Sequence, residues 1–237
     1  MNITAQTDVG QRKGTNEDAI ETASFGSTHL LVVADGMGGH ASSDVASELA
    51  TTTISENVST AIDDGRTDYE AMLNEALVSA NDAILDEAEA TNAQRSMGTT
   101  AVTAIVEDET AIIANVGDSR AYRVNDELTQ ITTDQSFVQE LIDQGEITPE
   151  EAKTHPQRHV LSQALGTEES VNPDFSSATV EDRVLLCSDG LTEEVSEKTI
   201  AEILHEASDI KAAGKELIQR ANENGGSDNI SVIIADV

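Results

Sequence analysis

The order of strand-like and helix-like segments constrains the fold of this chain more than any other feature. Three apolar stretches of strand length, residues 99–106, 111–116 and 120–124, follow one another with only short turns between them. Helical patterns instead occur in adjacent pairs, at 44–63 with 68–90 and at 197–207 with 209–222. Tight turns favour antiparallel pairing, and helices that do not alternate one-to-one with strands argue against a doubly wound parallel sheet. The sequence therefore predicts an α+β fold with antiparallel sheets and helix pairs packed outside them.

Three more apolar runs, at residues 30–34, 184–187 and 230–235, have the length of buried strands. Residues 136–153 have a helical pattern that Gly145 and Pro149 interrupt. No Pro-rich or Gly/Ser-rich linker divides the 237 residues. We therefore expect a single domain over residues 1–237.

The charge of the chain is extreme, with 13 basic against 45 acidic residues and a net charge of −32. The acids are interspersed along the whole sequence, so mutual repulsion should destabilise the folded state at ordinary ionic strength. At about 1 M salt the screening length falls to roughly 3 Å and most of that repulsion disappears. This pattern predicts the cytoplasm of a halophile. It also argues against nucleic acid or an anionic membrane as partners, because no basic patch is present to neutralise phosphates.

Targeting features and cysteine usage agree with a cytoplasmic location. No run of about 18 apolar residues could span a bilayer, and the first residues lack the basic and apolar parts of a signal peptide. Cys187 is the only cysteine, so no internal disulfide can form. Because it follows an apolar run, we expect it in the core rather than as a nucleophile.

Four aspartates lie beside glycine-containing turns at the ends of strand-like runs. Asp35, Asp118 and Asp189 each follow such a run, and Asp228 precedes one. Any one of them alone is most simply a turn residue. Together they can converge at one edge of antiparallel sheets, where carboxylates and closely approaching backbone form sites for hard divalent cations. Residues 16–18 add two further acids. The pattern predicts a metal-dependent hydrolase.

Six short motifs carry a family resemblance that spans residues 3–235. The chain resembles the metal-dependent serine/threonine protein phosphatases of type 2C, in their minimal prokaryotic form. The motifs follow the order of that family: TDVG at 7–10 with NED at 16–18, DGMGGH at 35–40, MGTT at 97–100, VGDSRAY at 116–122, LCSDGL at 186–191 and GSDNI at 226–230.

The resemblance implies a fold and a metal site. The fold is a central sandwich of two antiparallel β-sheets flanked by pairs of α-helices, four layers in all, in agreement with the segment order. The implied cofactors are two Mn²⁺ or Mg²⁺ ions with a weaker third. The implied ligands are Asp35 bridging both ions, the Gly36 carbonyl on one, Asp189 and Asp228 on the other, Glu17 and Asp18 beside them, and Asp118 with Asp189 at the third site.

The implied reaction is hydrolysis of phosphoserine and phosphothreonine. Two cations about 3.5–4 Å apart acidify a bridging water molecule, and the resulting hydroxide attacks the phosphorus without a phosphoenzyme. Phosphoproteins, the targets of a serine/threonine kinase, would be the substrates of a monomeric enzyme. Two alternatives stay open: a non-catalytic module that binds phosphoproteins, and a hydrolase of small phosphoesters.

Some residues depart from the family pattern. Where the family has a phosphate-binding arginine, this chain has Lys13 with Arg12 before it; either could hold the phosphate, or the two could be a solvated basic pair. Met37 replaces the histidine that is the general acid of eukaryotic members. His40 is then the nearest candidate proton donor, or it packs beside the site.

The segment 136–166 corresponds to a variable flap over the site. Residues 134–136 read Asp-Gln-Ser where relatives often have Asp-His-Ser. His155, Arg158 and His159 lie in the flap and could bind substrate or belong to an ordinary polar loop.

Overall fold

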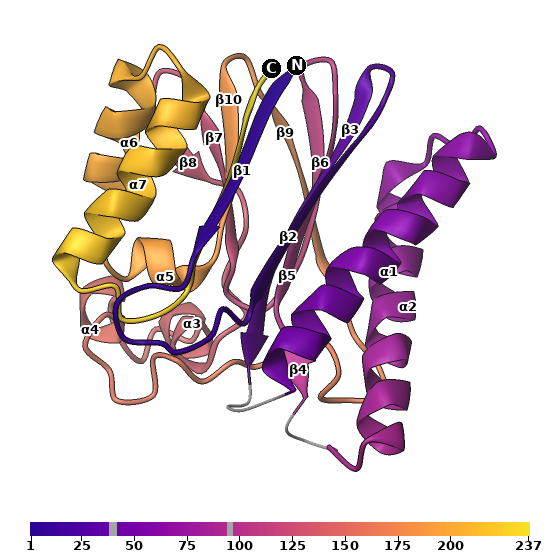
Figure 1. Ribbon diagram of the computed structural model, residues 1–237. Coiled ribbons are helices and arrows are strands. Elements are labelled where there is room, and N and C mark those ends of the chain that lie inside the picture. The colour runs from indigo at the N-terminus through magenta and orange to yellow at the C-terminus, as the bar shows by residue number, and fades with distance from the viewer. Residues whose placement is uncertain (38–41, 94–96) are drawn as a thin grey trace.

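Two antiparallel β-sheets pack face to face between two layers of helices (Figure 1). The structure is a computed structural model that describes residues 1–37, 42–93 and 97–237. All paired strands run antiparallel. The expected α+β sandwich is therefore present.

The elements of each layer are as follows. The first sheet has the order β1 (Asn2–Asp8), β11 (Ile230–Asp236), β10 (Arg183–Cys187), β7 (Arg120–Val124) and β8 (Leu128–Gln130). The second has the order β2 (Asp18–Phe25), β3 (Thr28–Met37), β5 (Ala101–Glu107), β6 (Thr110–Val116) and β9 (Asp174–Thr179), with β4 (Gly98–Thr99) paired to β3. The helices are α1 (Ser43–Asp63), α2 (Tyr69–Ala90), α3 (Phe137–Asp143), α4 (Pro149–Ala152), α5 (Asp189–Thr192), α6 (Glu197–Glu206) and α7 (Ile210–Asn224).

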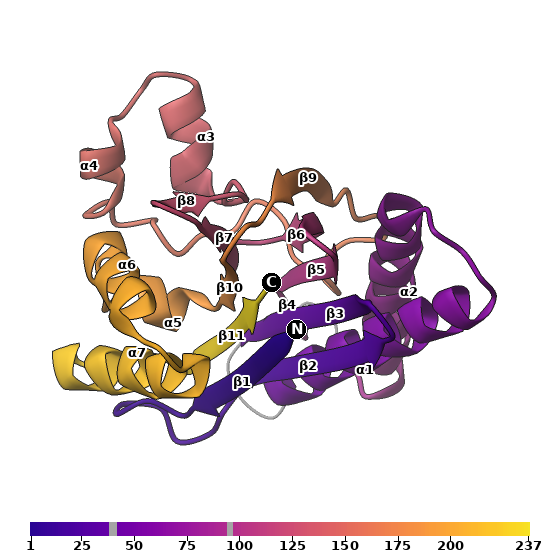
Figure 2. The ribbon, with the colours of Figure 1, turned by 90° about the horizontal axis from the view of Figure 1, so that it is seen from above.

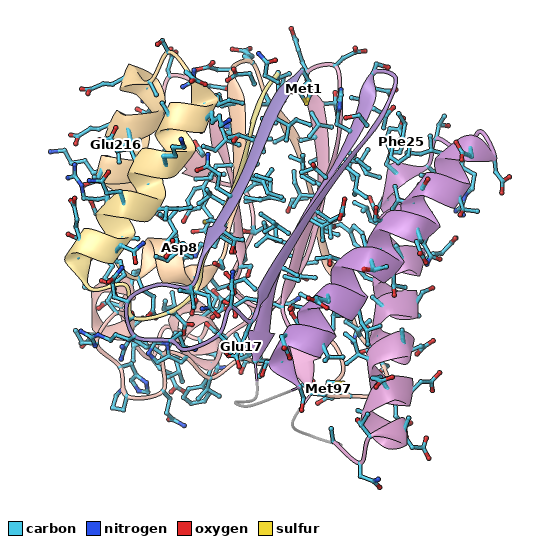
Figure 3. The ribbon with its side chains drawn as sticks, viewed as in Figure 1. Met1, Asp8, Glu17, Phe25, Met97 and Glu216 are labelled. Carbon is cyan, nitrogen blue, oxygen red and sulfur yellow. The ribbon has the colours of Figure 1, made fainter. Side chains whose placement is uncertain are left out.

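Continuous apolar runs form the central strands because both faces of these strands are buried. In β3, Leu30 and Val32 belong to the core beneath α1 and α2, whereas Leu31 and Val33 belong to the core between the sheets. Seen from above, α1 and α2 cover one outer face and α6 and α7 the other (Figure 2). Side chains fill the space between the sheets along the length of the sandwich (Figure 3). None of the helices in the described ranges has the length and apolarity needed to cross a membrane.

The three consecutive strand segments 99–106, 111–116 and 120–124 are divided between the two sheets. β6 pairs with β5 and β9, whereas β7 pairs with β10 and β8. The chain crosses from one sheet to the other at the turn after β6, where Gly117 has φ 101°. The stretch 99–106 is also divided at Thr100, whose N–H bonds to the Asp35 carbonyl at 2.9 Å.

Candidate metal centre

One end of the sandwich gathers the acidic residues that the sequence singles out. In an antiparallel sheet the start of one strand lies beside the end of its neighbour. Asp18 at the start of β2 thus faces Asp35 near the end of β3, and the end of β10 lies beside the first residues of β11. Asp35 lies inside β3 rather than just past it, because that strand continues to Met37. Figure 3 shows Glu17 at this lower end.

Asp18 lies deepest in the cluster, with 9% of its surface exposed. Its Oδ2 accepts hydrogen bonds from Ser188 Oγ at 2.8 Å and Ser231 Oγ at 2.6 Å. Its Oδ1 is buried and has no hydrogen-bond partner. Burial, together with the charges of Asp189 and Asp228, raises the pKa of Asp18 to about 7 against the two serine bonds. A buried carboxylate oxygen without a partner fits a cation ligand.

The acids around Asp18 also have raised pKa values. Burial, and then the charges of its acidic neighbours, raises the pKa of Asp35 well above its usual value. Burial and Asp228 raise the pKa of Asp189, although a hydrogen bond with Asp35 opposes the shift. Burial and Asp189 raise the pKa of Asp118 to about 8. Carboxylates that repel one another in this way are the donor set that Mn²⁺ and Mg²⁺ require.

Close backbone packing brings Gly36 into the cluster. Its N–H bonds to the Glu17 carbonyl at 3.1 Å. A Cβ at this position would lie 2.3 Å from the Ser43 carbonyl oxygen and 2.5 Å from that of Glu17. Only glycine therefore allows the start of α1 and the segment before β2 to approach β3 so closely.

The two basic candidates lie in different surroundings. Lys13 Nζ is 2.7 Å from Asp228 Oδ1 and 3.9 Å from Glu17 Oε2. Burial lowers the pKa of Lys13, but the bond to Asp228 and the surrounding acids outweigh it, so the pKa is raised. Arg12 is exposed, and its backbone N–H bonds to the Gly226 carbonyl at 3.2 Å. His40 lies outside the described residues.

Asn229 supports the centre, a role that sequence reasoning did not assign although the residue stands in the 226–230 motif. Its side-chain oxygen accepts the Glu17 N–H at 2.8 Å, and its amide donates to the carbonyls of Val9 at 2.9 Å and Thr15 at 3.0 Å. It is 2% exposed. This one side chain therefore holds both ends of the loop that carries Lys13. Ser188 and Ser231 were missed in the same way.

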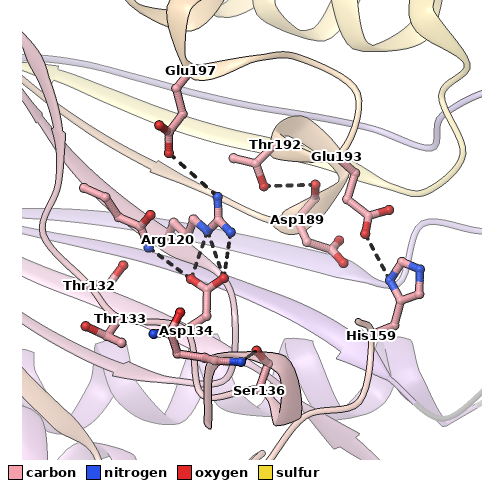
Figure 4. Close-up of polar contacts among 12 residues, drawn as sticks. Arg120, Thr132, Thr133, Asp134, Ser136, His159, Asp189, Thr192, Glu193 and Glu197 are labelled. Carbon is pink, nitrogen blue, oxygen red and sulfur yellow. Dashed lines mark hydrogen bonds and ion pairs between the residues drawn. The ribbon is translucent and has the colours of Figure 1, made fainter. Parts of the chain in front are cut away.

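Arg120 forms an ion pair with Asp134, two residues before the flap begins. Its guanidinium bonds bidentately to the Asp134 carboxylate, at 2.9 and 2.6 Å (Figure 4). Gln135, in the place of the family's histidine, accepts the Gly117 N–H at 2.9 Å. It thereby fixes the turn that carries Asp118.

The remaining candidates are placed as follows. His159 Nδ1 lies 3.0 Å from Glu193 Oε1, at the edge of the centre. His155 lies in the flap with its ring centroid 6.1 Å from that of Phe137. Cys187 is fully buried, and burial raises its pKa to about 12, which agrees with a core role.

Comparison with known proteins gives one family. Residues 7–233 match the family model described as Protein phosphatase 2C. Serine/threonine protein phosphatase PstP of Mycobacterium tuberculosis is 39% identical over 242 residues, covering 100% of this chain and 45% of the relative. The chain thus spans under half the length of that protein. Protein phosphatase PhpP of Streptococcus pneumoniae is 36% identical over 100% of this chain and 98% of its own length.

A solved structure also matches over nearly the whole chain. It is the catalytic domain of serine threonine protein phosphatase PstP in complex with two manganese ions. It superposes with a TM-score of 0.86 at 36% identity, covering 99% of this chain and 97% of that one.

Proposed function

Because this chain belongs to the protein phosphatase 2C family, we propose that it hydrolyses phosphoserine and phosphothreonine in proteins with two divalent cations. The observation that carries the proposal is the set of buried acids at one end of the sandwich, in which Asp18 Oδ1 has no partner. The manganese ions in the related PstP structure support Mn²⁺ as the cofactor, with Mg²⁺ as the alternative. The presence of every predicted metal aspartate argues against the alternative of a non-catalytic module that binds phosphoproteins.

The proposed ligand set follows the sequence prediction. Asp35, Gly36, Asp189, Asp228, Glu17 and Asp18 would hold the two ions, with Asp35 shared between them, and Asp118 would contribute to a weaker third site. When bound there, two cations would lower the pKa of water enough to supply hydroxide near neutral pH for direct attack on phosphorus. The buried state of Cys187 agrees with a reaction that needs no phosphoenzyme.

We assign the phosphate grip to Lys13 rather than Arg12. Lys13 Nζ already lies within 2.7 Å of an acid of the centre, so a substrate phosphate there would be within its reach. An ammonium group binds phosphate as a point charge, without the bidentate contact of arginine. His40 stays the proposed proton donor.

The biological setting is also proposed. The substrates would be phosphoproteins made by a serine/threonine kinase, and the chain would act as a monomeric single domain in the cytoplasm. Support comes from the relatives named as protein phosphatases and from the single cysteine, which suits a reducing compartment.

Substitution of one acid tests the proposal. Asp189→Asn should abolish Mn²⁺-dependent hydrolysis of p-nitrophenyl phosphate in multimolar KCl, because the site loses a charged ligand while the side chain keeps its shape. The exposed Asp82→Asn on α2 is the matched control and should keep full activity. Full activity of Asp189→Asn would contradict the two-cation mechanism. Rates on phosphopeptides against small phosphoesters then distinguish the two substrate classes.

A further inference from the structure

A buried asparagine of α2 holds the turn at which the flap ends. Asn81 is 1% exposed, and both polar atoms of its side chain have partners in this turn. Its Oδ1 accepts the Gly166 N–H at 2.8 Å, and its Nδ2 donates to the Glu168 carbonyl at 3.0 Å. The other buried residues of α2 are apolar. Packing of the helix therefore does not need an amide here, whereas the turn does.

The turn packs directly against the chain that leads into β4. Gly166 has φ 80°, and a Cβ there would lie 2.3 Å from Ile84 Cγ2 and 2.8 Å from the Met97 carbonyl oxygen. Beside it, Leu165 and Thr99 exchange two backbone hydrogen bonds, at 2.9 and 3.1 Å. The position of β4 is thus tied to the position of the turn.

β4 in turn holds the backbone of Asp35. Thr99 lies opposite Gly36 in the pairing of β4 with β3, and it is fully buried. Its Oγ1 donates a hydrogen bond to the Asp35 carbonyl at 2.8 Å. The direction in which the Asp35 carboxylate points depends on this backbone, so a shift of Thr99 moves a carboxylate of the metal centre.

We propose that Asn81 is a positioning residue for the metal centre, which keeps the Gly166 turn against β4 so that Thr99 holds the Asp35 backbone in place. The inference rests on the proposed function, in which Asp35 is shared by two cations. Groups that support a metal ligand from behind change metal affinity by about 10- to 100-fold when they are lost. A purely structural asparagine would instead lower stability and leave the metal affinity of the folded chain unchanged.

Removal of the amide tests the proposal. Asn81→Leu keeps much of the side-chain volume and removes both hydrogen bonds, so the Kd for Mn²⁺, measured by calorimetry in multimolar KCl, should rise about 10-fold. Thr103→Val is the matched control, because Thr103 is fully buried and its Oγ1 donates to the Ala114 carbonyl at 3.1 Å within the same sheet. This control should lose stability but keep the Kd within about twofold of the wild type. A wild-type Kd in Asn81→Leu, or an equal rise in both variants, would overturn the proposal.

Hydrogen exchange of the metal-free chain gives a readout that involves neither Mn²⁺ nor activity. The Thr99 and Leu165 N–H groups should lose protection in Asn81→Leu, because the turn no longer holds β4. They should keep more protection in Thr103→Val. Equal protection of the two N–H groups in both variants would overturn the proposed route from Asn81 to Asp35.

A measurement on the wild type keeps the proposal testable if Asn81→Leu does not fold. Coupling between two sites acts equally in both directions. Mn²⁺ should therefore slow hydrogen exchange of the Gly166 N–H, which bonds to Asn81. Unchanged exchange of this group would overturn the proposal. Binding of Mn²⁺ with these effects but without hydrolysis of phosphoesters would contradict the proposed function alone.

Discussion

The metal centre depends on single polar side chains that hold its loops in place. Asn229 makes three hydrogen bonds across the loop of residues 9–17. Asn229→Ala should lower the free energy of unfolding by about 2–4 kcal/mol, since it removes three hydrogen bonds that contribute roughly 1 kcal/mol each. Urea unfolding in KCl measures this, and Mn²⁺ affinity should fall with it.

The control for that substitution is Asn57→Ala. Asn57 is exposed on α1 and makes a bond to the Thr53 carbonyl within the same helix. Its removal should change stability by less than about 0.5 kcal/mol. Equal losses in the two variants would show that Asn229 does not hold the loop.

Lys13 and Arg12 differ in their surroundings, because Lys13 contacts Asp228 whereas Arg12 is exposed. Lys13→Met should raise KM for a phosphopeptide about 10-fold or more at saturating Mn²⁺, because a charged hydrogen bond contributes about 1.5–3 kcal/mol. Arg12→Met is the matched control and should leave KM within about twofold. The reverse order of the two KM values would transfer the phosphate grip to Arg12.

At the scale of elements, the centre requires β3 to pack tightly against the start of α1. Gly36→Ala places a Cβ 2.3 Å from the Ser43 carbonyl oxygen, and backbone cannot move away cheaply. We expect a loss of at least about 2 kcal/mol in unfolding free energy, as for overpacked sites, together with weaker Mn²⁺ binding by calorimetry. Gly14→Ala has nothing within 4 Å of the new Cβ and should be nearly neutral. Comparable losses in both variants would argue against the packing constraint.

The sequence predicts those strands and helices whose buried residues form a continuous or regularly spaced apolar pattern. The apolar runs at 30–34, 184–187 and 230–235 lie within β3, β10 and β11, and all four long helical patterns are confirmed. The missed strands β1, β2, β8 and β9 are the four sheet edges. Edge strands bury less and carry polar residues, so no continuous apolar run marks them. The sequence also does not predict the crossing from one sheet to the other after β6, because a tight turn can join strands of the same sheet or of different sheets.

The candidate site also contains residues that the sequence predicts and residues that it does not. The acids are recognisable from their glycine neighbours and their order, and the structure brings Asp18, Asp35, Asp118 and Asp189 into mutual electrostatic contact. The polar residues that support these acids are not recognisable in the sequence. The hydrogen-bond partners of Ser188, Ser231 and Asn229 lie more than 40 residues away along the chain. A serine or asparagine at a strand end has ordinary local uses. Only the fold selects the distant partner.

At the scale of the whole molecule, the net charge of −32 opposes the compact state. The repulsion between surface acids is screened when the Debye length shortens to a few ångströms in concentrated salt. We expect Tm to rise by about 10 °C between roughly 0.1 M and 2 M KCl, equivalent to about 3 kcal/mol for a chain of this size. Calorimetry of the metal-free and the Mn²⁺-loaded chain measures the effect.

A charge-reduced variant distinguishes screening from other actions of salt. Asp82, Asp86 and Glu89 are exposed on α2, so converting them together to Asn, Asn and Gln removes three negative charges without disturbing the core. This variant should be more stable than the wild type in dilute buffer and should respond less to KCl, because fewer charges remain to be screened. A wild-type Tm independent of KCl, or an equal salt response in both proteins, would contradict the halophilic interpretation.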